Sequence, residues 1–63
     1  MKRYDVIVGA SNTVNKFFNT LEEVAEWLEN CQGRVSIIDK NIGHEIFNGP
    51  IETWLRQYHL KLI

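Results

Sequence analysis

The most constraining feature of the chain is a helix start at Thr20. The segment Thr-Leu-Glu-Glu that begins there matches the capping box. In this motif the Thr20 hydroxyl accepts a hydrogen bond from the backbone N–H of Glu23, and the Glu23 carboxylate accepts one from the N–H of Thr20. Apolar residues then recur at helical spacing, so we expect an amphipathic helix from about residue 21 to about residue 31. Its apolar face comprises Leu21, Val24, Ala25, Leu28 and Cys31, with Trp27 at the edge.

Two pairs of strand-like segments flank this helix. They are rich in β-branched and aromatic residues and show the alternation typical of strands. The strands are expected over residues 4–8, 14–18, 34–40 and 44–47. Turns rich in Gly, Asn, Ser and Asp separate the members of each pair, over residues 9–13 and 39–43, and Gly43 suits a positive φ. The pattern therefore predicts two hairpins.

A second helix is expected after the fourth strand. Asn48, Gly49 and Pro50 end that strand, and proline is tolerated in a first helical turn because an N–H there has no partner. The helix runs from about residue 50 to about residue 60. The order ββαββα predicts an α+β fold in a single small domain, residues 1–63, with a four-stranded antiparallel sheet and the first helix packed on one face. The C-terminal helix has three candidate positions: the same face, the end of the sheet, or another subunit.

Composition excludes several classes of protein. The chain has 63 residues, a net charge of −1 and one cysteine. It has no room for separate cofactor and substrate domains, no basic excess typical of nucleic-acid binding, and no internal disulfide or zinc site of several thiolates. Its apolar runs are too short to span a membrane, no export signal is recognisable and no internal repeat is visible. With its single thiol, the chain is expected in the cytoplasm.

Half of the eight acidic residues fall on the polar side of the first helix. They are Glu22, Glu23, Glu26 and Glu29. One interpretation is a solvated helix face; the other is a negative docking surface that imitates nucleic-acid phosphates and occupies a basic partner. Trp54 and Tyr58 of the C-terminal helix are aromatic residues of the kind enriched in interfaces, so they join the candidate partner-binding residues.

Basic residues gather on or beside the predicted strands. They are Lys2, Arg3, Lys16, Arg34 and Lys40. If several share the sheet face opposite the first helix, they form a basic patch in which Tyr4, Phe17 or Phe18 supply stacking groups, as in sheet-based RNA-binding domains. The basic-Gly-aromatic motif of such domains is absent. Nucleic-acid binding is therefore the alternative hypothesis.

No catalytic, metal-binding or cofactor-binding set is recognisable. His44 and Glu45 are neighbours on a strand and point to opposite faces, which suits no acid–base pair. His59 lies near the end of the second helix, and Cys31 lies at the end of the first helix, away from any activating N-terminus. The segment from Gly9 to Asn12 lacks the second glycine of a nucleophile elbow. We therefore expect no enzyme, no cofactor and no metal.

The C-terminal segment is more apolar than one buried stripe requires. Leu60, Leu62 and Ile63 follow the aromatic residues of the second helix. They either complete a small core or meet a second subunit, and small domains often gain stability by association. A homodimer through this helix or through an edge strand is therefore a further expectation.

Together these features favour a non-enzymatic interaction protein that docks on a partner protein and blocks or modulates it. In size and in its compact α+β plan, the chain is similar to the small accessory proteins of phages and mobile elements, which inhibit host nucleases, polymerases or CRISPR systems. That likeness is one of size and style, so it assigns no residues. The alternative is a small nucleic-acid-binding regulator that uses the basic residues of the sheet.

Overall fold

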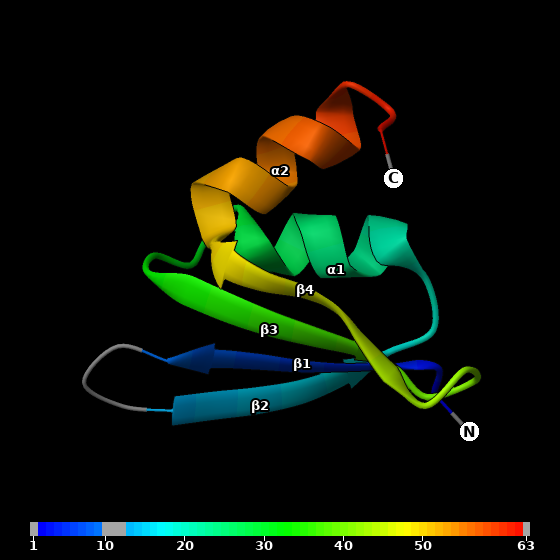
Figure 1. Ribbon diagram of the computed structural model, residues 1–63. Helices are drawn as coiled ribbons and strands as arrows, with labels where there is room; N and C mark the ends of the chain where they lie inside the picture. The colour runs from blue at the N-terminus through cyan, green and yellow to red at the C-terminus, as the bar shows by residue number, and fades with distance from the viewer. Residues whose placement is uncertain (1, 10–12, 63) are drawn as a thin grey trace.

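The predicted element order is confirmed. The structure is a computed structural model that describes residues 2–9 and 13–62. Its elements are β1 (Tyr4–Gly9), β2 (Thr13–Phe18), α1 (Leu21–Leu28), β3 (Arg34–Asp39), β4 (His44–Pro50) and α2 (Ile51–His59) (Figure 1). Most of the turn predicted over residues 9–13 lies outside the described residues.

The four strands form one antiparallel sheet in the order β2-β1-β3-β4. The two hairpins thus join through β1 and β3, and β2 and β4 form the edges. A bulge interrupts the pairing of β3 with β4, because Ile37 faces Phe47 whereas Ile38 faces Glu45. Ile46 is the extra residue of β4, and it is 42% exposed. The predicted α+β fold is confirmed.

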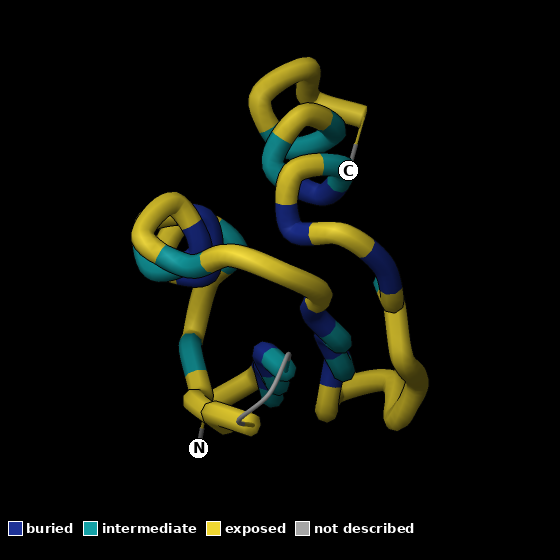
Figure 2. Tube along the Cα trace, turned by 90° about the vertical axis from the view of Figure 1, so that its left-hand side faces the viewer, coloured by how far each residue is buried: buried dark blue, intermediate teal, exposed yellow. Residues whose placement is uncertain are grey.

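Both helices lie on one side of the sheet (Figure 2). α1 packs against β1 and β2, while α2 packs against β4 and α1. Of the three positions considered for the C-terminal helix, the structure thus shows the same face as α1. The core between sheet and helices comprises Tyr4, Val6, Val8, Val24, Ala25, Leu28, Val35, Ile37, Ile51 and Trp54. The alternate residues of the strands point to the opposite face, which no described helix covers.

Two predicted boundaries were wrong. α1 ends at Leu28 rather than near Cys31, and the chain turns there, with the Cys31 N–H donating to the Leu28 carbonyl at 3.0 Å. β4 continues through Gly49 to Pro50. Gly49 is buried opposite Val35, and a side chain at position 49 would lie 3.1 Å from the Phe47 ring. Glycine at position 49 therefore allows the Phe47 ring to pack closely against the backbone. β4 is an edge strand, where Pro50 is also tolerated.

Asp39, where the predicted strand over residues 34–40 and the predicted turn over residues 39–43 overlap, is the last residue of β3, and only 4% of it is exposed. Its carboxylate accepts hydrogen bonds from Arg3 Nε at 3.1 Å and from the Arg3 guanidinium Nη2 at 2.8 Å. It also accepts one from the Asn41 N–H at 3.0 Å, and its carbonyl accepts one from the Gly43 N–H at 2.8 Å. Gly43 has φ +73°, as predicted. Asp39 therefore joins the start of the chain to the β3–β4 turn.

The capping box of α1 generates a stability prediction. The Glu23 N–H donates to Thr20 Oγ1 at 3.2 Å, and the Thr20 N–H donates to Glu23 Oε1 at 3.1 Å. Thr20→Ala leaves the Glu23 N–H without its acceptor and is expected to lower the free energy of unfolding by about 1 kcal/mol in urea titrations. Thr20→Ser keeps the acceptor and serves as the control. Equal stability of the alanine variant and the wild type would contradict the assignment.

The Arg3–Asp39 contact generates a pH prediction. The hydrogen bonds from Arg3 hold the pKa of Asp39 below its ordinary value of 3.8. The stability that this pairing contributes is therefore present above the unfolded pKa and is lost as the pH falls through the lower folded pKa. We expect Asp39→Asn to lower the thermal midpoint at pH 7, and the gap to the wild type to narrow as the pH falls below 3.8. A gap that stays the same size as the pH falls would contradict this reading.

Candidate functional site

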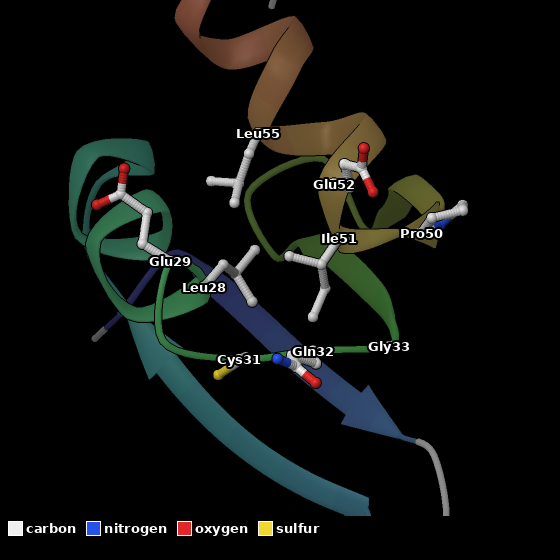
Figure 3. A pocket seen from close by; sticks show the side chains of 9 residues that line it. All are labelled: Leu28, Glu29, Cys31, Gln32, Gly33, Pro50, Ile51, Glu52 and Leu55. Atoms are coloured by element: carbon white, nitrogen blue, oxygen red, sulfur yellow. The ribbon is translucent and has the colours of Figure 1, made fainter.

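A groove of about 420 Å³ lies between the end of α1 and the start of α2 (Figure 3). Its floor is apolar: the partly buried Leu55 reaches the surface, above Leu28, which is fully buried, and Ile51, which is 3% exposed. The carboxylates of Glu29 and Glu52 stand on either side of this floor in Figure 3. We call this site the α1–α2 groove.

The loop after α1 sets the width of the groove. α1 stops at Leu28, and Gly33 adopts φ +105°, a conformation that favours glycine. The Gly33 carbonyl then accepts a hydrogen bond of 2.9 Å from the Ile51 N–H. This bond ties the first residue of α2 to the loop, so Leu28 and Ile51 face each other although 23 positions separate them in the sequence.

The two carboxylates of the groove have only exposed partners. Glu29 Oε1 lies 3.3 Å from Nε2 of His59, and their side chains are 53% and 57% exposed. Glu52 Oε1 lies 3.6 Å from Arg56 Nη2, with side chains 87% and 67% exposed. Exposed pairs of this kind contribute little and exchange readily with other partners. Both carboxylates are therefore accessible to a cation that enters the groove.

The predicted acidic residues divide into two groups. Glu23 belongs to the capping box, where its carboxylate accepts from the backbone N–H groups of Asn19 and Thr20 at 3.1 Å. Glu22, Glu26 and Glu29 are exposed, and their spacing of four and then three residues puts them on one side of α1. We call these three residues the acidic stripe. Glu29 belongs to both the acidic stripe and the groove, so the two surfaces are continuous.

The structure places Trp54 in the core, where it is 1% exposed. Its ring stacks on Tyr58 at a centroid distance of 5.4 Å and an interplanar angle of 15°, and Tyr58 is partly buried. Trp54 thus supplies packing rather than a contact surface. Glu52 and Leu55 were not singled out as site residues. Their place beside Leu28 depends on how the helices pack, which no local pattern of the sequence reveals.

The five basic residues predicted for a sheet face do not gather into one patch. Arg3 is bound by Asp39 at one end of the sheet, and Arg34 lies at the other end, opposite Gly9. The Lys16 ammonium lies on the helix side, 5.6 Å from the centroid of the Trp27 ring. Three of the five nevertheless line a second depression: Lys2, Lys16 and Lys40.

The histidines and the cysteine lie apart. His44 begins β4, whereas His59 ends α2. The Cys31 thiol donates a hydrogen bond to the Trp27 carbonyl at 3.3 Å, and partial burial raises its pKa. Within residues 2–9 and 13–62, no three His, Cys, Asp or Glu side chains are grouped as a metal site requires. Neither helix of the described chain is long and apolar enough to cross a membrane.

Comparisons of the chain with family models, with curated proteins and with solved structures found no match. The α1–α2 groove therefore has to be interpreted from its own chemistry. The partly exposed Leu55 can pack against an aliphatic stem, and the two carboxylates beside it can pair with a positive charge at the end of that stem. Lys and Arg side chains combine these two properties.

Proposed function

We propose that the protein is a non-enzymatic interaction protein that docks on a basic segment of a partner protein through the α1–α2 groove. The observation that carries this proposal is the partly exposed Leu55, which covers the buried Leu28 and Ile51 and lies between the carboxylates of Glu29 and Glu52. A Lys or Arg side chain of the partner lies with its stem on this floor and its charge between the carboxylates.

The acidic stripe extends the contact along α1. Glu22 and Glu29 are seven positions apart, a distance of about 10 Å along a helix. A partner that fills the groove with one basic side chain therefore meets further carboxylates one and two turns away. This spacing favours a segment with several positive charges over a single one. Charges at the rim of an interface mainly increase the association rate and the specificity of such contacts.

Docking on a basic surface has a regulatory consequence. Basic segments of proteins commonly hold nucleic-acid phosphates, and carboxylates in a row present a similar negative charge. We propose that the protein blocks or modulates its partner by occupying that surface, in the manner of a small inhibitor from a phage or mobile element. The small size of the chain and its exposed acidic stripe support this proposal.

Peptide selection tests the groove. From a random displayed library, the wild-type protein is expected to enrich peptides with Lys or Arg beside aliphatic residues. Glu29→Gln with Glu52→Gln is expected to bind the enriched peptides about fivefold more weakly, because two exposed charge pairs together contribute about 1 kcal/mol. Binding is measured by fluorescence anisotropy, and thermal midpoints verify the fold of each variant.

A matched control removes two charges from the other side of the sheet. Asp5 and Glu45 accept side-chain hydrogen bonds there from Asn15 and Ser36, and Asp5→Asn with Glu45→Gln keeps an acceptor at each position. This control is expected to bind the enriched peptides like the wild type. Enrichment of acidic peptides, or equal loss of binding in control and groove variant, would contradict the proposal.

We also propose that the end of α2 mediates a homodimer. Leu60 and Leu62 are 62% and 69% exposed, so the core leaves them free for a second copy. The mass in sedimentation experiments is expected to rise with concentration from 7.4 kDa toward twice that value, and Leu60→Ser with Leu62→Ser should keep it at the monomer value. A constant monomer mass of the wild type at high concentration would rule out the dimer.

A further inference from the structure

An open depression of about 530 Å³ lies beside β2, toward the end of the sheet away from the α1–α2 groove. Five exposed residues line it: Lys2, Asn15, Lys16, Phe17 and Lys40. The three lysines come from three separate segments: the start of the chain, β2, and the β3–β4 turn. We call this site the lysine cleft. It concentrates three of the seven basic side chains of a protein whose net charge is −1.

The Arg3–Asp39 contact holds two of these segments together. Arg3 binds the Asp39 carboxylate, and the backbone N–H of Lys40 donates to the Arg3 carbonyl at 2.8 Å. Lys2 and Lys40 are the chain neighbours of these residues. The lysine cleft therefore has a fixed backbone on this side, although its side chains are exposed.

Phe17 contributes an exposed aromatic ring to the lysine cleft. It is 43% exposed and pairs with Asp5, which alternates with the buried Tyr4 and Val6 of β1, so it lies on the face of the sheet that the helices leave uncovered. The Lys40 ammonium lies 5.0 Å from the centroid of this ring. Among the residues that the structure describes, no carboxylate lies within ion-pairing distance of the Lys2, Lys16 or Lys40 ammonium groups. The Lys16 ammonium points to the helix side, toward Trp27, so the cleft offers an aromatic face beside the charges of Lys2 and Lys40.

We propose that the lysine cleft binds single-stranded nucleic acid. A base stacks on Phe17, and the phosphates on either side of that base pair with Lys2 and Lys40. Lys40 has a flexible four-carbon stem, so its ammonium moves from the ring to a phosphate when the base arrives. Because stacking is available to every base, the site reads no defined sequence.

The exposed ring of Phe17 favours a single strand over an acidic peptide or a duplex. An acidic peptide would need the lysines but gains little from a flat ring, whereas a duplex keeps its base faces stacked inside the helix. The lysine cleft is lined only by exposed residues, so it suits a strand that passes over the surface rather than an enclosed mononucleotide. A single strand is the ligand that uses both the charges and the ring.

The inference is independent of the proposed docking function. The lysine cleft includes residues beside the Tyr4–Asp39 pair, whereas the α1–α2 groove adjoins the Arg34–Pro50 pair at the other end of β3. A six-residue strand places its ends about 17 Å apart. Variants of one site therefore leave the other intact, and failure of either proposal is distinguishable from failure of the other.

Anisotropy titrations with labelled mixed-sequence strands of about 12 nucleotides test the lysine cleft. Two phosphate contacts predict a slope of log affinity against log salt of about −1.4, and Lys40→Gln should reduce the slope to about −0.7. Phe17→Leu keeps an apolar side chain but loses the flat ring. It should weaken binding about tenfold with an unchanged slope. In amide NMR spectra, shifts on binding should be confined to residues near Lys2, Lys16, Phe17 and Lys40.

The matched control is Arg56→Gln with Lys61→Gln, which removes two positive charges from the region of α2 and should leave affinity unchanged. No binding at about 20 mM salt would overturn the proposal. The proposal would also be wrong if duplex bound as tightly as the single strand, or if Phe17→Leu left the affinity unchanged. Polyglutamate serves as a competitor. If it displaces the labelled strand as effectively as unlabelled single-stranded nucleic acid does, the ligand is an acidic protein segment and the proposal is wrong.

Discussion

The ion pair between Arg3 and the buried Asp39 is the constraint on which the architecture of one end of the molecule depends. A carboxylate that is 4% exposed is tolerated only with partners for its charge, and Arg3 supplies two hydrogen bonds from the start of the central strand β1. The same carboxylate organises the β3–β4 turn through Asn41. One buried charge thus links the start of the chain to a turn almost 40 positions later, and it places Lys2 beside Lys40.

The net charge of −1 conceals a separation of charge along the sheet. The carboxylates of Glu29 and Glu52 lie beside an apolar floor at one end, and Lys2 and Lys40 lie beside an aromatic ring toward the other. In each site the charges lie beside an apolar surface. The α1–α2 groove has a floor that suits an aliphatic stem, and the lysine cleft has a ring that suits a base. The two proposals together describe a small protein suited to a place where a basic protein and a nucleic acid meet.

The features that could be predicted from the sequence are those that depend on neighbouring residues. The capping box of Thr20 and Glu23 and the alternation within the strands predicted the elements and their order. Gly49 was misplaced because its residue type favours turns, while its actual role depends on the Phe47 ring. The burial of Asp39 was not predicted, because it depends on the distant Arg3. The candidate sites were recovered only in part. Glu29 and Phe17 were recognised by type, but the residues that complete each site come from distant segments, and only the sheet register and the helix packing bring them together.

The sheet order β2-β1-β3-β4 divides the chain into two ββα halves. Each element of the second half begins 30 or 31 residues after its counterpart in the first, although the sequence shows no repeat. The halves meet through the β1–β3 ladder and the contact of α1 with α2, and the loop over residues 29–33 joins them. Two chains that exchanged their second halves would rebuild the same ladder with this loop as the hinge. Each groove would then take Leu28 from one chain and Ile51 from the other.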